Sequence, residues 1–340
     1  MSHITDHRSD FVDIENFPAL EQYLRRTARI GPEEHPKFRS LSGGVSNRVV
    51  LVEIAEGKSW VMKQALEKLR VAADWHCSLE RIHREALALA LLERIAPPGT
   101  TTPLIFEDRE QFLLAMQAVP SPHINWKQAL MEGMFDERLF DQAGSLLRAI
   151  HTQGAELEDA ARREFADRTF FHSLRVEPYY LYTASILPDA AGFLHALAAG
   201  MDTFAETIVH GDFSPKNMLI HKERLVLLDH EVAHLGDPAF DLGFFLAHVL
   251  SKAHHFPERR DRFLDAALRF WRVYEDTRGL ESRAVRHTLG CLLARVAGRS
   301  PLEYLSSAER QHQQSAVLSL LNAPPETMAA LAEQFRERIR

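Results

Sequence analysis

The chain has 340 residues, of which 46% are hydrophobic and 26% charged, with a formal net charge of −7 and a pI near 6.2. This composition is typical of a globular protein with a substantial core, and it excludes disordered and fibrous proteins. The negative charge argues against general nucleic-acid binding and slightly favours a neutral or cationic small molecule as partner.

The two cysteines, Cys77 and Cys291, are too few for a disulfide framework or a thiolate zinc site. The most apolar stretch, residues 241–250, is too short to cross a membrane, and the polar residues 1–10 do not resemble a signal peptide. We therefore expect a cytoplasmic protein without membrane contact. The sequence does not indicate its oligomeric state.

The first third of the chain predicts a small sheet and one helix. Alternating apolar residues predict strands over residues 37–41, 48–55, 59–63 and 111–116. The helix is predicted over residues 78–95, with an apolar face formed by Leu79, Ile82, Ala86, Leu89, Leu92 and Ile95. Residues 117–122 predict an extended hinge. We therefore expect an N-lobe of residues 1–116 and a C-lobe of residues 123–340.

The remainder predicts a mostly helical structure. Helices are expected over residues 137–153, within 159–187, over 240–255, through Arg262, Ala284 and Ala308, and from Thr327 onward. The segment 159–201 carries several aromatic side chains, which we expect in the core rather than against a ligand: Phe170, Phe171, Tyr179, Tyr180 and Tyr182.

The most informative motif is His-Gly-Asp-Phe-Ser-Pro-Lys-Asn at residues 210–217. Apolar runs at 207–209 and 218–220 predict a strand on each side, and the run 225–228 predicts a strand that ends at Asp229. An Asp five residues before an Asn can direct a carboxylate at a substrate hydroxyl while the Asn oxygen reaches a magnesium ion. Asp212, Asn217 and Asp229 therefore predict a kinase active site, with Asp229 as the second metal ligand.

Two further motifs follow this loop. They are Asp-His-Glu at residues 229–231 and Gly-Asp-Pro-Ala-Phe-Asp-Leu-Gly at residues 236–243. The series resembles the aminoglycoside phosphotransferase and choline kinase superfamily of protein-kinase-like enzymes. The resemblance implies an α+β, bilobal fold with a small antiparallel-sheet N-lobe and a larger, mostly helical C-lobe. It also implies that Asp241 braces the catalytic loop through backbone hydrogen bonds and that His210 holds the loop conformation.

The same resemblance implies an ATP site in the first third. Gly43 and Gly44 would lie in a hairpin turn that covers the phosphates with backbone. Lys63, at the end of a strand, would contact the phosphates, and Glu85 on the following helix would pair with it. Glu80 is the alternative partner. Segment 159–201 lies where this superfamily places its substrate-binding helices.

A narrower resemblance is found within the first lobe. It covers Lys63-Gln64-Ala65-Leu66, then Arg70, Trp75 and Ser78-Leu79-Glu80-Arg81, and this stretch is similar to the one that follows the strand lysine in methylthioribose kinases. The catalytic loop departs from those kinases, because they lack its Asn. The likeness favours shared ancestry over a shared substrate.

Two other functions are consistent with single features of the sequence. The segment His230-Glu231-Val232-Ala233-His234 matches the His-Glu-x-x-His motif of zinc metallohydrolases, which requires a helix to bring both imidazoles to one metal. Here it directly follows a predicted strand and is cut short by the Gly-Asp-Pro at 236–238, so we expect a chance match. A silent ATP-binding regulator is disfavoured because no expected catalytic group is missing.

The function predicted from the sequence is transfer of the ATP γ-phosphoryl group to a hydroxyl of a small molecule, with ATP and Mg²⁺ as cofactors. Asp212 would orient the hydroxyl and accept its proton. Glu231 and Lys216 are possible additional participants at the site. The acceptor class, whether an aminoglycoside, an amino alcohol, a choline-like alcohol or a thiosugar, stays open.

Overall fold

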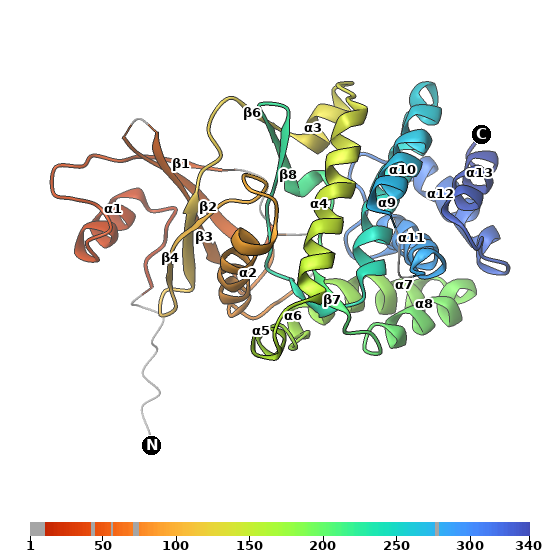
Figure 1. The fold of residues 1–340 in the computed structure, drawn as a ribbon, viewed down its shortest axis with the longest axis horizontal. Coiled ribbons are helices and arrows are strands. Elements are labelled where there is room, and N and C mark those ends of the chain that lie inside the picture. Colours follow the sequence, from red (N-terminus) through yellow and green to blue (C-terminus); the bar gives the residue numbers. More distant parts are fainter. Residues whose placement is uncertain (1–10, 42–44, 56, 71–74, 276–278) are drawn as a thin grey trace, which may run out of the picture. The chain divides into compact units, whose positions relative to one another are not determined.

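The computed structural model describes residues 11–41, 45–55, 57–70, 75–275 and 279–340. The chain forms two compact units (Figure 1), Met1–Ala90 with Thr102–Pro120 as unit 1, and Leu91–Thr101 with Ser121–Arg340 as unit 2. The predicted functional division into lobes stays a prediction, because compactness does not show what each part does.

Unit 1 is built on an antiparallel sheet with the strand order β1-β2-β3-β5-β4. Its strands are β1 (Lys37–Ser40), β2 (Asn47–Ala55), β3 (Lys58–Ala65), β4 (Leu104–Asp108) and β5 (Leu113–Gln117). Its helices are α1 (Phe17–Arg26) and α2 (Arg81–Ile95), and α2 belongs to unit 1 as far as Ala90. The strands predicted from the sequence are present, with ends shifted by one or two residues.

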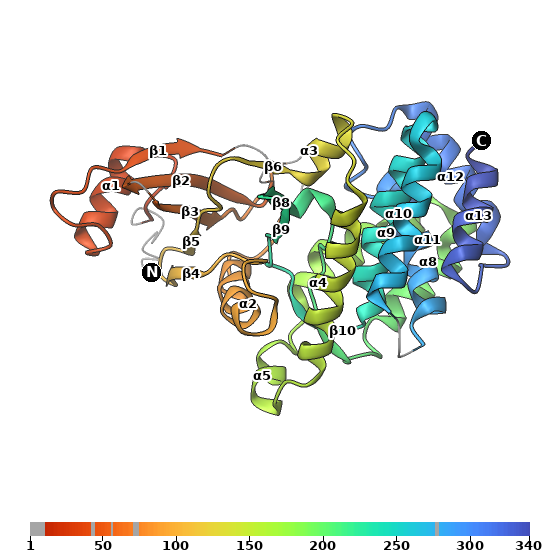
Figure 2. The same ribbon diagram turned by 45° about the horizontal axis from the view of Figure 1, so that its top comes forward.

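Alternation along the central strand β3 gives the sheet two different faces. Trp60 and Met62 pack in a cluster with α1, whereas Val61 and Ala65 pack in a cluster with α2. Figure 2 shows the two helices together with the sheet. Lys63 lies between Val61 and Ala65 in this alternation and therefore projects from the face that α2 covers.

Two helix features of unit 1 differ from the prediction. Helix α1 was not predicted, although Asn16 caps it by accepting a hydrogen bond from Ala19 N (3.3 Å). Helix α2 begins at Arg81 rather than at residue 78. The Arg81 guanidinium binds the carbonyls of Cys77 (3.2 Å) and Ser78 (2.7 Å), which holds the preceding residues in a turn.

Unit 2 contains two small antiparallel sheets and a set of packed helices (Figure 2). One sheet pairs β7 (Thr207–Val209) with β10 (His234–Gly236), and the other has the order β6 (His123–Asn125), β8 (Met218–His221), β9 (Arg224–Leu227). The helices are α3 (Trp126–Met131), α4 (Glu137–Ala155), α5 (Asp159–Glu164), α6 (Thr169–Phe171), the π-helix (His172–Leu181), α7 (Tyr182–Ile186), α8 (Pro188–Gly200), α9 (Pro238–His255), α10 (Arg260–Tyr274), α11 (Glu281–Ala297), α12 (Ser307–Leu321) and α13 (Met328–Arg338). Short 3₁₀ turns lie at Pro215–Asn217 and Pro257–Arg259.

Helix α9 forms the centre of unit 2 and is buried along almost its whole length. It crosses α11 at very close range, because a Cβ placed on Gly243 would lie 2.5 Å from the Cβ of His287 and 2.7 Å from its backbone. Only glycine permits this approach. The aromatic side chains of Phe171, Tyr179 and Tyr180 are buried in the surrounding core, as predicted, whereas those of Phe170 and Tyr182 are half-buried.

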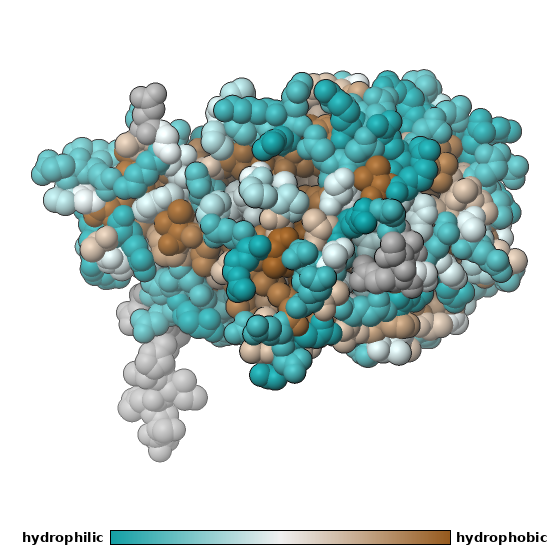
Figure 3. All heavy atoms as spheres, viewed as in Figure 1, coloured by the Kyte–Doolittle hydropathy of each residue, from teal (hydrophilic) through white to brown (hydrophobic). Residues whose placement is uncertain are grey.

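The apolar residues of unit 2 are concentrated in this core. On the face drawn in Figure 3, hydrophilic side chains cover most of its helices. None of the helices in the described part of the chain has the length and apolar character needed to cross a membrane. An α+β fold with an antiparallel sheet in the first part and a mostly helical remainder was predicted and is confirmed.

Candidate active site

In unit 1, Lys63 and Glu85 form a buried ion pair. Lys63 Nζ lies 2.6 Å from Glu85 Oε1, and the two residues are 8% and 0% exposed. Strand β3 and helix α2 bring them together across the covered face of the sheet. The alternative partner, Glu80, precedes α2 and has a side chain that is 55% exposed. The pairing predicted from the sequence is therefore present, and a role in ATP binding stays a prediction.

We expect Glu85→Gln to raise the KM for ATP by about tenfold or more, because Lys63 would lose the charge-assisted bond that fixes its ammonium group. The measurement is the initial rate as a function of ATP concentration, with an acceptor that the wild type phosphorylates. Glu80→Gln is the matched control, since it makes the same change at an exposed position next to the same helix. Equal KM values for wild type and Glu85→Gln would contradict the role of the pair.

The backbone that follows the predicted phosphate-covering turn is held by Arg81. Gly43 and Gly44 themselves lie outside the described residues. The buried Arg81 guanidinium binds the carbonyl of Ser46 and, at 2.8 Å, that of Leu66. One side chain thus joins the backbone directly before β2 to the start of α2. Arg81 was not predicted to have this role, because no local pattern in the sequence indicates it.

In unit 2, the predicted catalytic loop connects β7 with β8. The 3₁₀ turn Pro215–Asn217 folds the loop back, so that Asn217 Nδ2 donates to Asp212 Oδ2 (2.6 Å) and to Asp212 O (3.0 Å). Gly211 has φ +76, and a Cβ there would lie 2.9 Å from a methyl carbon of Val232. Glycine is therefore required directly before Asp212.

The loop is braced from helix α9 by Asp241, which is fully buried. Its carboxylate accepts hydrogen bonds from the backbone N–H groups of His210 (2.6 Å) and Gly211 (2.8 Å), and it contacts His151 Nε2 at 3.2 Å. The ring of His210 lies 3.1 Å from the amide nitrogen of Asp212, which can donate to Nδ1. The predicted bracing contacts of Asp241 and His210 are both present.

The residues predicted to bind metal lie on adjoining segments of unit 2. Leu228 N donates to Asn217 O (2.9 Å), which ties the end of β9 to the catalytic loop. Asp229 follows in a left-handed conformation (φ 68), and a carboxylate oxygen of Asp229 lies within 4.8 Å of one of Glu231. Both hydrogen bonds given above for Asn217 use its amide nitrogen. Its oxygen makes neither of these bonds. Amide and carboxylate oxygens are hard ligands of the kind that suit Mg²⁺, and metal binding by these residues stays a prediction.

The His-Glu-x-x-His segment does not form a helix. His230 and Glu231 lie in a turn, whereas His234 lies in strand β10, with its ring stacked on Phe171 at 4.0 Å. His230 lies next to the His210 ring, at 5.0 Å between ring centroids. The helical geometry required for a metallohydrolase zinc site is therefore absent from this described segment.

The structure adds a residue to the site that sequence reasoning missed. Arg175, buried in the π-helix, lies with Nη2 2.8 Å from Asp212 Oδ1, and its Nε donates to Gly211 O (2.8 Å). Burial lowers the pKa of Arg175, but the negative charges of Asp212, Glu231 and Asp229 contribute to a net increase. The guanidinium therefore stays charged and fixes the position of the Asp212 carboxylate through this ion pair.

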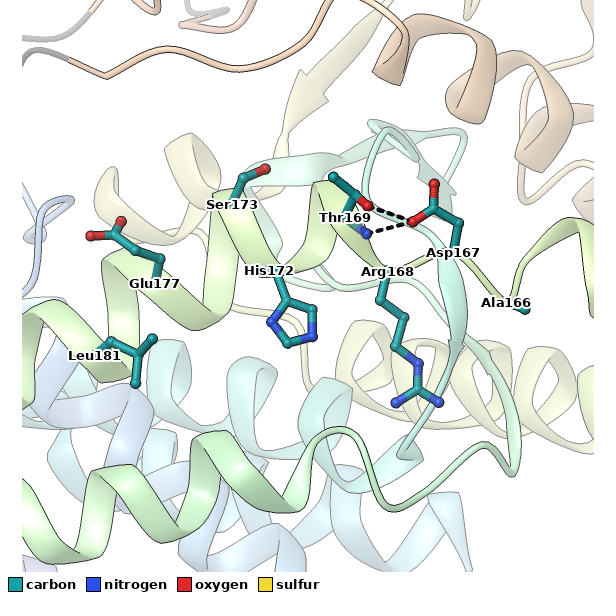
Figure 4. A pocket seen from close by; sticks show the side chains of 8 residues that line it. All are labelled: Ala166, Asp167, Arg168, Thr169, His172, Ser173, Glu177 and Leu181. Carbon is teal, nitrogen blue, oxygen red and sulfur yellow. Dashed lines mark hydrogen bonds between the residues drawn. The ribbon is translucent and has the colours of Figure 1, made fainter.

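The π-helix presents a second, outward face. His172, Ser173, Glu177 and Leu181 line an open pocket together with residues 166–169 (Figure 4). Arg175 lies on the inward side of the same helix. A π-helix is rare and occurs often at functional sites. Arg175 contacts the catalytic loop from this π-helix. No sequence pattern predicts this helix type.

Comparisons with known proteins agree with this geometry. The model of the phosphotransferase enzyme family (APH) matches residues 37–283. Methylthioribose kinase 2 of Oryza sativa subsp. japonica is 24% identical over 280 residues, which cover 72% of this chain and 65% of that protein. Methylthioribose kinase of Escherichia coli is 26% identical over 249 residues, covering 64% and 58%. The chain thus aligns with less than two thirds of the length of these two relatives.

A solved structure shows the same fold. A choline/ethanolamine kinase family protein from Mesorhizobium loti superposes with a TM-score of 0.56 at 16% identity, covering 94% of this chain and 99% of that one. The protein-kinase-like fold predicted from the sequence is confirmed, and so is the family resemblance, since the family model spans most of the chain. The chain belongs to the phosphotransferase enzyme family.

Proposed function

We propose that the protein is an ATP- and Mg²⁺-dependent small-molecule kinase that transfers the γ-phosphoryl group of ATP to a hydroxyl. The observation that carries the proposal is the fixed catalytic loop. Asp212 is held on one oxygen by Arg175 and on the other by Asn217, and the backbone before it is held by Asp241. Phosphoryl transfer depends mainly on such positioning and on charge stabilisation.

Each residue has a defined role in this proposal. Asp212 orients the acceptor hydroxyl and takes its proton as the new P–O bond forms. Lys63, held by Glu85, contacts the ATP phosphates, and the backbone at Gly43 and Gly44 covers them. Asn217 and Asp229 would hold Mg²⁺, with Glu231 as an additional ligand. The metal, when bound, neutralises charge on the phosphates.

The acceptor is a small molecule of a type that the relatives leave open. The two methylthioribose kinases favour a thiosugar by name, but their identity is low and they align over part of their length. Aminoglycosides, choline-like alcohols and amino alcohols are the other candidate acceptors. Fold similarity does not select among them, because the acceptor pocket is set by side chains and not by the fold.

The test is ATP consumption with Mg²⁺ across these four acceptor classes, with Asp212→Ala as the blank and zinc content assayed on the same sample. We expect at least one acceptor to be phosphorylated by the wild type and none by the blank. Stoichiometric zinc without ATP binding would instead support a hydrolase, whereas ATP binding without any turnover would mean either an acceptor outside these classes or a regulator.

A further inference from the structure

Positive side chains in unit 2 gather beside the catalytic loop, and the proposed function does not use them. They are Lys127 on α3, Lys216 in the 3₁₀ turn before Asn217, Lys252 on α9 and Arg295 on α11. We refer to these four residues as the cation cluster. They are far apart in sequence and come together only through the packing of the helices around α9.

Two lysines of the cluster lie against the same tyrosine ring, and the pKa values of both are lowered by neighbouring positive charges. Lys252 Nζ lies 5.3 Å and Lys127 Nζ 5.9 Å from the centroid of the same ring, that of Tyr304. Burial, followed by the charges of Lys127 and Arg295, lowers the pKa of Lys252 to about 7. Burial, followed by the charges of Lys216 and Arg295, lowers the pKa of Lys127 to about 8.

The cluster has few negative partners. Lys252 is 1% exposed, and its ammonium contacts only the carbonyl of His248 (3.4 Å) and the Tyr304 ring within the described structure. Arg295 is 7% exposed and donates to Tyr179 Oη (2.9 Å) and to Ser300, while its Nε has no partner among the described residues.

Among the described residues, one carboxylate forms an ion pair with the cluster. Glu303, whose side chain is 65% exposed, forms an ion pair with Lys127. Glu309 lies near Tyr304, but His255 (2.6 Å) and the backbone of Ser306 (2.7 Å) already bind it. The cluster thus keeps an excess of positive charge in a buried place, which costs stability unless an anion binds there.

The cluster connects to Asp212 through aromatic side chains. Arg175, which binds Asp212, and Arg295 each lie 5.7 Å from the Tyr179 ring centroid. The Arg175 guanidinium also lies 5.7 Å from the ring of Phe244, which precedes Lys252 by eight residues on α9. Eight residues of helix rise about 12 Å, so the positive charges extend from Asp212 over the length of a small metabolite.

We propose that the cation cluster binds an anionic group of the acceptor, so that the acceptor is a hydroxylated carboxylic acid or phosphate monoester rather than an aminoglycoside or a choline-like cation. Lys252, Lys127 and Arg295 hold the anion, and Lys216 approaches it from the catalytic loop. This inference rests on the proposed kinase function for its assignment to the acceptor. The net negative charge of the chain favoured a neutral or cationic small molecule. The proposal departs from that preference, because the charge close to the bound group decides binding.

The first test measures anion binding without turnover. Inorganic phosphate at constant ionic strength is titrated into the full chain, and the melting temperature is recorded for wild type, Lys252→Met and Lys222→Met. Lys222 lies in the exposed turn between β8 and β9 and makes the matched control. We expect phosphate to stabilise the wild type and the control but not Lys252→Met. Without phosphate, Lys252→Met should be at least as stable as the wild type, because it removes a buried unpaired charge.

The second test compares matched acceptors: D-glucose, D-gluconate and D-glucose 6-phosphate, with methylthioribose and choline as neutral and cationic arms. We expect turnover with an anionic acceptor, and Lys252→Met or Lys127→Met should raise its KM about tenfold or more with a smaller change in kcat. Gluconate and glucose 6-phosphate distinguish a carboxylate from a phosphate as the bound group.

The outcomes separate this inference from the kinase proposal. Turnover of only neutral or cationic acceptors, or equal phosphate stabilisation of all three proteins, would overturn the anionic acceptor and leave the kinase proposal standing. Loss of phosphate stabilisation in Lys252→Met without turnover of any acceptor would support the anion site and count against the kinase reaction.

Discussion

Replacing Asp212 with Asn is expected to lower kcat by about 10³-fold, within the range found when a positioned proton acceptor is removed. An amide cannot take the proton of the acceptor hydroxyl, although it fills nearly the same space. The KM for ATP should change little, because Lys63 and Glu85 are untouched. Single-turnover rates with a saturating acceptor, together with ATP binding by calorimetry, measure the two effects separately.

The control for this change is Asp265→Asn on the exposed side of α10, which should keep full activity. Because the Arg175 guanidinium loses its carboxylate partner in Asp212→Asn, some loss of stability is also expected. Rates are therefore compared at a temperature at which both variants are folded. Retained turnover in folded Asp212→Asn would remove Asp212 from the mechanism.

Replacing Asp241 with Asn is expected to lower the free energy of unfolding by about 3 kcal/mol, since a buried charged acceptor of several hydrogen bonds is lost. The new amide would direct a donor at the N–H of His210 or Gly211, both of which donate to Asp241 in the wild type. Urea unfolding monitored by circular dichroism measures the loss. The exposed Asp265→Asn should change stability by less than about 0.5 kcal/mol.

The effect of Asp241 should depend on pH in a defined direction. Burial raises its pKa, but the hydrogen bond and charge of His151 and the charge of His210 lower it to a net value below 3.8. A lowered folded-state pKa means that the carboxylate stabilises the fold above the unfolded-state pKa, and that this stability is lost as pH falls through the folded-state value. The difference between wild type and Asp241→Asn should hold at pH 7 and 5 and shrink below about pH 4. A constant difference down to pH 3 would contradict this account.

Much of the fold was predictable because the relevant signals are local. The strand at residues 207–209 and the helix after Asp237 are marked by apolar runs, by a Pro in the first turn and by a capping Asp. Helix α1 carried a similar signal in Asn16 and Pro18 that was overlooked. Helix α8 gave no clear periodicity, because it is rich in Ala and Gly and has few polar residues to mark an exposed face.

The candidate site was only partly predictable, for a related reason. Lys63, Glu85, Asp212 and Asp241 occupy positions to which the family resemblance assigns roles, so their contacts could be expected. Arg175 lies 36 residues before Gly211 in a helix type without a sequence signature, and its contact with Asp212 depends on tertiary packing. The cation cluster could not be predicted from the sequence either, because each of its members, considered alone, resembles an ordinary surface residue.

Helix α9 joins two requirements of the site in one rigid body. Near its first turn Asp241 fixes the loop that carries Asp212, and eleven residues later it carries Lys252, a separation of about 16 Å along the axis. Because Gly243 locks α9 against α11, the helix cannot slide to change this spacing. A change of acceptor length in evolution would therefore require new side chains around the cation cluster, while the position of the reacting hydroxyl would stay the same.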